Sequence, residues 1–124
     1  MLYFVYDGSF PGLFTTIYEA FYSDNPPDEI TADDNYSAHL FSQKKEIATD
    51  QTKADKVYNG IQKEISDYTL KSIYYAYLSE KKGIETTIYN YLKLAFKQGT
   101  EINKLHNNPT VKKIKSARKK VSSE

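Results

Sequence analysis

The sequence predicts an α+β fold dominated by helices, in which about five helices pack with a small sheet led by an N-terminal strand. Three observations predict it. The apolar run LYFVY opens the chain, as expected of a strand buried on both faces. Apolar residues then recur every three or four positions in several later segments, which is the helical period. Ser, Asp and Pro stand at the start of these segments, where helices favour them.

The first helix is expected directly after the N-terminal strand, which spans residues 2–6. Asp7 and Gly8 interrupt the apolar run, Ser9 is a good N-cap, and Pro11 fits the first helical turn. The helix that follows is apolar over a wide arc, so we expect it to be deeply packed. The sequence NPP at 25–27 ends it.

The middle of the chain is expected to hold a surface connection, a strand and two helices. The acidic stretch up to about Gln43 predicts the surface connection, and residues 44–48 predict a second short strand. Asp50 precedes one helix, and Ser66 caps the next. Their apolar stripes are Ala54, Val57, Tyr58, Ile61 and Ile65 in the first, and Leu70, Ile73, Tyr74, Tyr77 and Leu78 in the second.

Two further helices complete the prediction. A long helix begins at Ile84 and is expected to bend at Gly99, and a last helix over 109–121 begins at Asn108-Pro109. The central residues of the helical stripes are expected to form the core: Leu13, Ile17, Phe21, Ile61, Ile73, Tyr77, Ile88 and Leu92.

Length and composition limit the classes of protein. A chain of 124 residues with 40% hydrophobic residues suits one domain, 1–124, either whole or the N-terminal portion of a longer protein. The absence of cysteine excludes a disulfide framework and any thiolate metal site. The apolar stretches are far shorter than the roughly 18 residues of a membrane span, and no basic segment precedes the first of them. We therefore expect a cytoplasmic protein without membrane contact.

The net charge of +1 conceals an uneven distribution. Residues 1–50 hold nine acidic and two basic side chains, whereas residues 101–124 hold seven basic and two acidic ones. A polyanion is therefore expected to bind the C-terminal end. The 12 tyrosines suit half-buried surfaces, partner interfaces and base-stacking platforms alike.

The segment Asp7, Gly8 and Ser9 is a candidate anion site. Free N–H groups at a helix start can bind a phosphate, but the segment lacks the several glycines and the lysine of a nucleotide loop. We therefore favour a structural turn with Ser9 as the cap over an anion site.

The sequence shows no set of catalytic or metal-binding residues. His39 and His106 lie far apart without thiolate partners, which predicts surface histidines and no metal site. No nucleophile motif is present, and the acidic pairs fall in an expected solvent loop.

The basic last helix is the main candidate functional element. Lys112, Lys113, Lys115, Arg118, Lys119 and Lys120 surround a narrow apolar seam. Such a helix can pack through one side and present cations to phosphates with the other. A solvated helix face, or an interface with an acidic protein, would give the same composition.

Three segments resemble a known bacterial family. They are YDGSFPGLFTTIYEAFYS, the central IYYAYLSEKKGIETTIYNYLKLAFKQG, and the spacing L-x-x-x-P-x-V-x-x-I-x-x-x-R-x-x-V that begins at Leu105 and ends at Val121. Together they resemble a family described as probable DNA metabolism proteins, and the resemblance spans nearly the whole chain.

The resemblance implies a role in DNA modification or repair beside a partner. Family members are encoded next to a radical S-adenosylmethionine protein. Because this chain has no cysteine, an iron–sulfur cluster would belong to that partner, and no cofactor is expected here. The family's proteins continue beyond the glutamate matched by Glu124, so the resemblance implies an N-terminal portion. We assign no catalytic residue.

Two hypotheses follow. In the first, the chain is a DNA-metabolism accessory protein that contacts nucleic acid through the basic helix while the radical S-adenosylmethionine partner performs the chemistry. In the second, it is a non-catalytic adaptor that binds this partner through protein contacts and does not touch nucleic acid.

Overall fold

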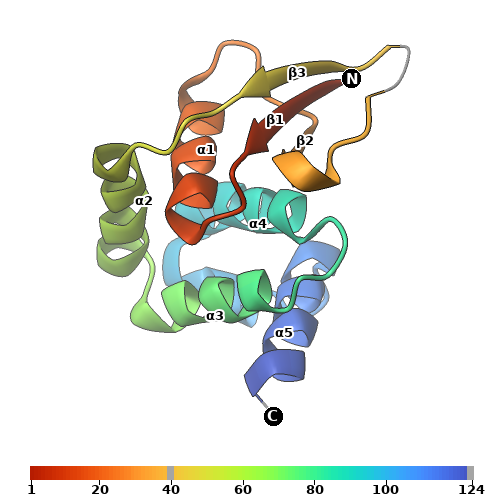
Figure 1. Ribbon diagram of the computed structural model, residues 1–124. Coiled ribbons are helices and arrows are strands. Elements are labelled where there is room, and N and C mark those ends of the chain that lie inside the picture. The colour runs from red at the N-terminus through yellow and green to blue at the C-terminus, as the bar shows by residue number, and fades with distance from the viewer. Residues whose placement is uncertain (39–40, 123–124) are drawn as a thin grey trace. The chain divides into compact units, whose positions relative to one another are not determined.

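The described strands and the first helix lie in the N-terminal half of the chain. The computed structural model describes residues 1–38 and 41–122 (Figure 1). Its contacts group into an N-terminal region, residues 1–58, and a C-terminal region from residue 59 onward. The N-terminal region contains β1 (Leu2–Tyr6), α1 (Phe10–Tyr22), β2 (Glu29–Ala32), the 3-10 turn η1 (Asp33–Asn35) and β3 (Gln43–Glu46).

Helices alone make up the C-terminal region as described. The helix α2 (Gln51–Glu64) runs from the first region into the second. The C-terminal region then contains α3 (Asp67–Leu78), α4 (Ile84–Gln98), the 3-10 segment η2 (Gly99–Lys104) and α5 (Pro109–Ser122). The predicted α+β class with five helices, a small sheet and an N-terminal strand is confirmed.

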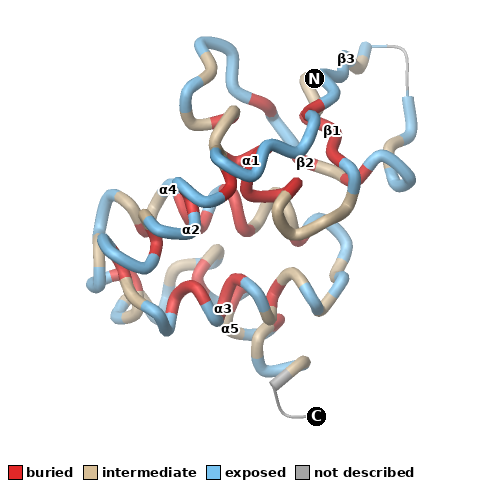
Figure 2. The backbone as a smooth tube through the Cα atoms, turned by 60° about the vertical axis from the view of Figure 1, so that its left-hand side comes forward, coloured by how far each residue is buried: buried red, intermediate tan, exposed pale blue. Residues whose placement is uncertain are grey.

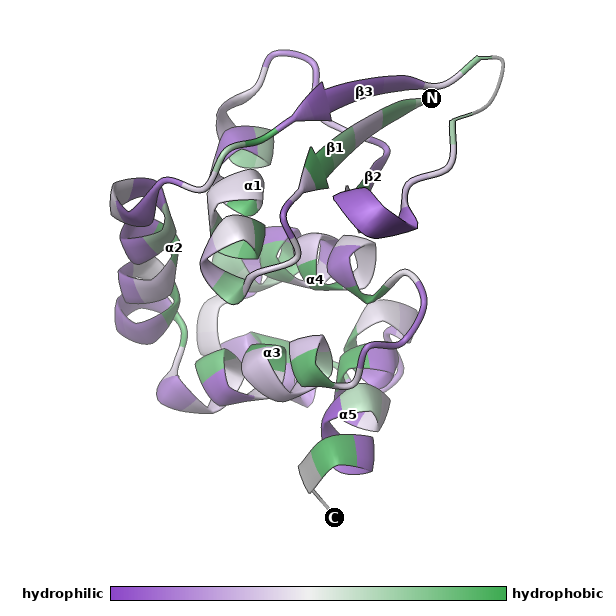
Figure 3. Ribbon diagram, in the orientation of Figure 1, coloured by the Kyte–Doolittle hydropathy of each residue, from purple (hydrophilic) through white to green (hydrophobic). Residues whose placement is uncertain are grey.

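The sheet is parallel, with β1 in the centre. Its strand order is β2-β1-β3, and Phe4 lies opposite Ile30 on one side and Lys45 on the other. Phe4, Val5 and Tyr6 are buried, and α1 packs against β1. The β-branched and aromatic residues of β1 suit this central position. Figure 2 shows the resulting burial along β1, and Figure 3 shows the contrast between its apolar residues and the hydrophilic β3.

One strand was missed and one was shifted by the sequence prediction. The expected surface connection contains β2, which exists because its backbone pairs with β1 over four residues. The second strand runs over Gln43–Glu46 and not over 44–48. All four of its residues are exposed, and charged residues such as these are common on edge strands.

The predicted helix starts are confirmed. The Ser9 Oγ accepts a hydrogen bond from the Gly12 N–H at 3.0 Å, and the Ser66 Oγ accepts one from the Thr69 N–H at 3.0 Å. The Asp50 carboxylate accepts one from the Lys53 N–H at 3.1 Å. Each bond satisfies a backbone donor that the first helical turn leaves without a partner.

The long helix expected after Gly83 is shorter than the apolar pattern suggests. Gly99 adopts φ +62°, and its N–H bonds to the Ala95 carbonyl. This conformation is accessible to glycine at little cost and ends α4, after which the chain continues as the 3-10 segment η2.

The predicted core is largely confirmed. Leu13, Ile17, Ile61, Ile73, Ile88 and Leu92 have no exposed surface. Phe21 and Tyr77 are half-buried, because both lie in the last turn of their helices, where fewer neighbours surround a side chain. The stripe prediction was wrong for Tyr58, Tyr74 and Leu78, which are more than 40% exposed.

Candidate nucleic-acid interface

Local sequence sets the start of α5. The Asn108 carboxamide oxygen accepts hydrogen bonds from the backbone N–H groups of Thr110, at 2.9 Å, and Val111, at 3.2 Å. Pro109 occupies the first helical position, where its missing N–H costs nothing. The helix therefore begins at the predicted residue.

One side of α5 is buried in the C-terminal region. Val111, Ile114 and Ala117 are at most 1% exposed, and α5 packs against α3 and α4. Their spacing of three residues places them on one side of a helix with 3.6 residues per turn. This packing fixes the direction in which the lysines of α5 point.

Four lysines share the opposite side and form what we call the basic face: Lys112, Lys113, Lys119 and Lys120. All four are exposed. At about 100° per residue they span an arc of about 120°, and from Lys112 to Lys120 the helix rises about 12 Å. The side chains of Lys112, Lys113 and Lys120 have no ion-pair or hydrogen-bond partner among the described residues.

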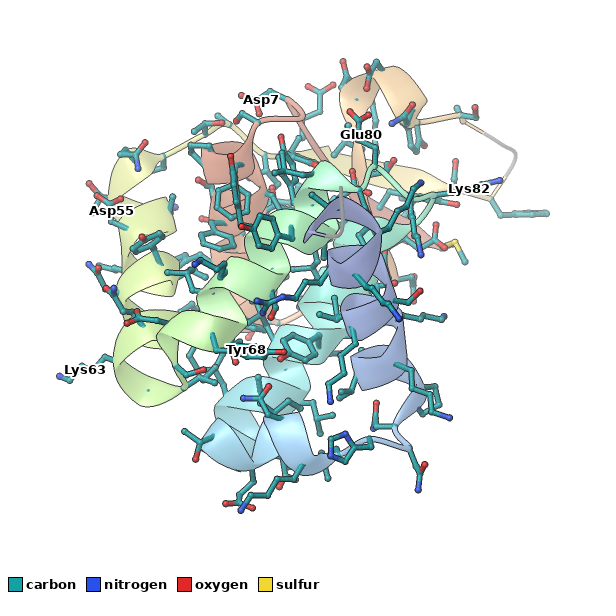
Figure 4. The ribbon with its side chains drawn as sticks, turned by 90° about the horizontal axis from the view of Figure 1, so that it is seen from below. Asp7, Asp55, Lys63, Tyr68, Glu80 and Lys82 are labelled. Carbon is teal, nitrogen blue, oxygen red and sulfur yellow. The ribbon has the colours of Figure 1, made fainter. Side chains whose placement is uncertain are left out.

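The loop between α3 and α4 adds a cation that sequence reasoning missed. The Lys81 Nζ donates a hydrogen bond to the Ser116 Oγ at 3.2 Å. Ser116 lies between Lys112 and Lys120 on the exposed arc, so Lys81 extends the basic face. Figure 4 shows the neighbouring Glu80 and Lys82 on the same loop. The pair of lysines before Gly83 was the only signal in the sequence.

Arg118 has a different role from the four lysines. Its Nη1 donates to the Ser72 Oγ at 2.5 Å and to the Tyr68 carbonyl at 3.5 Å. Its guanidinium carbon lies 4.2 Å from the Tyr68 ring centroid and 5.7 Å from that of Tyr75. Because a guanidinium packs well on aromatic rings, Arg118 joins α5 to α3.

Lys115 is also engaged within the chain. Its Nζ lies 3.0 Å from the Nδ1 of His106 and 3.4 Å from the Asn103 carbonyl oxygen. An ammonium can only donate a hydrogen bond, so the His106 Nδ1 is the acceptor in this contact. Lys115 thus binds the segment that precedes α5 through Asn103 and His106. His106 is exposed, as expected for a surface histidine.

The segment Asp7, Gly8 and Ser9 already contains an anion. One Asp7 carboxylate oxygen accepts from the Ser9 N–H at 2.9 Å and the Ser9 hydroxyl at 2.6 Å, and the other accepts from the Thr49 hydroxyl at 2.9 Å. The two Ser9 hydrogen bonds lower the pKa of Asp7 below its ordinary value of 3.8. The carboxylate therefore stays charged at neutral pH and would repel a phosphate placed beside it.

The turn itself forms as predicted. Gly8 adopts φ +89°, a left-handed conformation that glycine reaches without strain. It lets the chain leave β1 and enter α1 within three residues. The strand-to-helix junction is confirmed, and the candidate anion site stays a prediction that the Asp7 charge disfavours.

No group of three metal-ligating side chains occurs in residues 1–38 and 41–122. His39 and Glu124 lie outside the described residues. None of the described helices combines the length and the apolar character that a membrane crossing needs.

Comparison with protein-family models, with curated proteins and with solved structures finds no match to this chain.

Proposed function

We propose that this chain is a nucleic-acid-binding accessory protein of DNA metabolism. The observation that supports it is the basic face, where exposed lysines line one side of a well-anchored helix. The helix is held by its buried side and by Arg118, so its packing does not depend on the exposed side that bears these lysines. Phosphates are the natural ligands of such a row of ammonium groups.

The resemblance supplies the biological setting of the proposal. It suggests a radical S-adenosylmethionine protein as the partner that performs the chemistry, and in our proposal this chain binds the nucleic acid. Because phosphate contacts position a protein without specifying bases, the basic face would bind many sequences alike.

A salt series tests the proposal. The binding of fluorescein-labelled DNA would be followed by anisotropy between about 50 and 200 mM salt, the range in which phosphate contacts change affinity steeply. With five lysines in contact, the plot of log K against log salt should have a slope of about −4.5 for duplex DNA.

A single-lysine variant sharpens this test. Lys113→Gln should make the slope less steep by about 0.9, whereas Lys56→Gln, at an exposed lysine of the N-terminal region, should leave it unchanged. A pull-down of the radical S-adenosylmethionine partner distinguishes the adaptor hypothesis. Loss of partner capture in Lys113→Gln, together with no DNA binding by the wild type at low salt, would contradict the proposal.

A further inference from the structure

The exposed side of α3 is aromatic. Tyr68 is 49% exposed and Tyr74 is 43% exposed, and the exposed Lys71 lies between them in sequence. Tyr75 is half-buried beside them. We call Tyr68, Tyr74 and Tyr75 the aromatic patch. Large rings that remain accessible on a helix surface commonly mark a binding site when they gather in one place.

Ring contacts connect these tyrosines to one another and to α5. The ring centroids of Tyr74 and Tyr75 lie 6.2 Å apart. The Arg118 guanidinium lies over both Tyr68 and Tyr75, and Figure 4 shows Tyr68 on α3 near α5. The aromatic patch is therefore continuous with the helix that bears the lysines.

The order of residues around α5 places the patch next to the basic face. At about 100° per residue, Arg118 on α5 is followed by Lys115 and then by Lys119 and Lys112. A ligand that crosses from α3 to the exposed side of α5 would thus meet rings first, then Arg118, then lysines.

Rings beside ammonium groups suit a single strand better than a duplex. In a duplex the faces of the bases are covered by their neighbours, so exposed tyrosines have nothing to stack on. In a single strand each base has a free face, and aromatic side chains beside a cationic groove are the usual means of binding it. The Arg118 contact also holds the Tyr68 ring in place before any ligand arrives, which reduces the entropy lost on binding.

We propose that the aromatic patch stacks unpaired bases of a single-stranded nucleic acid whose phosphates follow the basic face. This inference rests on the proposed function and specifies the form of its ligand. Stacking by the patch adds affinity that does not depend on salt, whereas the lysines supply the salt-dependent part.

The test compares a labelled single strand of about 16 nucleotides, the upper end of common single-strand site sizes, with the duplex of the same sequence. Tyr74→Leu should lower single-strand affinity about tenfold, with an unchanged salt slope and unchanged duplex affinity. Tyr74→Phe keeps a ring and should stay close to the wild type. Tyr22→Leu is the matched control, because Tyr22 is 75% exposed in the N-terminal region.

An abasic single strand provides a measurement that needs no variant. It keeps the phosphates and lacks the bases, so wild-type affinity for it should fall at least as far as in Tyr74→Leu. Equal binding of abasic and normal strands, or equal losses for single strand and duplex in Tyr74→Leu, would overturn this inference alone. Absence of binding to every oligonucleotide at low salt would overturn the proposed function as well.

Discussion

The two regions of the chain have opposite charge. Residues 1–58 hold four basic and ten acidic side chains, and residues 59–124 hold 13 basic and six acidic ones. The overall net charge of +1 conceals this difference completely. A polyanion would be attracted by the second region and repelled by the first.

The two regions also use their cations differently. In the first, all four lysines have a partner: Lys44 pairs with Glu46, Lys53 with Glu19, Lys45 lies over the Phe4 ring, and Lys56 lies over the Tyr18 ring. In the second, Lys112, Lys113 and Lys120 have no such partner among the described residues. The comparison teaches that a count of charges alone does not separate cations that are engaged within the fold from cations that a ligand can reach.

Arg118 offers the sharpest way to break this comparison, since it is a cation of the second region with a structural role. Arg118→Ala removes the hydrogen bond to Ser72 and the packing on Tyr68, so the free energy of unfolding should fall by about 2–3 kcal/mol. Urea unfolding measures it. Lys112→Ala, at an exposed position, should change stability by less than about 0.5 kcal/mol, and similar losses for both would contradict the assignment.

Gly12 tests how tightly the first region is organised at the start of α1. A Cβ on Gly12 would overlap the Asp7 carboxylate and approach the Ser9 and Thr49 hydroxyls at 2.8 and 2.9 Å. Gly12→Ala should therefore disrupt this set of hydrogen bonds and cost about 2 kcal/mol in thermal or urea unfolding.

Gly83 is the matched position in the second region. It adopts φ +76°, and nothing lies within 4 Å of an added Cβ, so Gly83→Ala should cost only the backbone strain of about 1 kcal/mol. A larger loss at Gly83 than at Gly12 would reverse the comparison.

Ser9→Ala should have a smaller effect at the same helix start. It removes the cap on the Gly12 N–H and the hydroxyl bond to Asp7, and should lower the free energy of unfolding by about 1 kcal/mol. Ser9→Asp would restore a cap but place a second carboxylate beside Asp7. We expect Ser9→Asp to be no more stable than Ser9→Ala. Stability equal to that of the wild type would show that the Asp7 charge does not disfavour a second carboxylate at this position.

The smallest effect concerns pH and belongs to the first region alone. Because the folded pKa of Asp7 lies below 3.8, its ionised form stabilises the fold above that pH. This contribution disappears as the pH falls through the folded pKa. The difference in unfolding free energy between the wild type and Asp7→Asn should thus be constant above about pH 5 and shrink below 3.8. A difference that grows towards acid pH would contradict it.

Local signals in the sequence predicted most of the fold. Four helix starts are capped by a side-chain oxygen that accepts from a backbone N–H two or three residues later, at Ser9, Asp50, Ser66 and Asn108. Such contacts can be inferred from a short stretch of sequence. The strand β2 was missed because its four residues, EITA, contain only two apolar side chains. It is formed by pairing with β1, about 26 residues earlier in the chain, and no local pattern contains that information.

The candidate site was likewise predicted where local spacing decides the outcome and missed where distant residues meet. Helical spacing placed Lys112 and Lys120 on the exposed side of the last helix, where they lie. The engagement of Arg118 with Ser72, and the approach of Lys81 to Ser116, join residues 46 and 35 positions apart. These two contacts depend on how α5 meets α3 and the loop that follows it, and no local pattern shows them.

A paired measurement of salt dependence tests the central claim most directly. The double variants Lys112→Gln/Lys120→Gln and Lys45→Gln/Lys56→Gln remove the same charge, one from the basic face and one from lysines that lie over rings. Binding of labelled single-stranded DNA would be measured for both across a salt series. The account predicts a slope less steep by about 1.4, or 0.7 for each lost phosphate contact, for the first variant and a wild-type slope for the second. Equal changes in the two variants would show that only the net charge matters and would contradict a phosphate-binding face on α5.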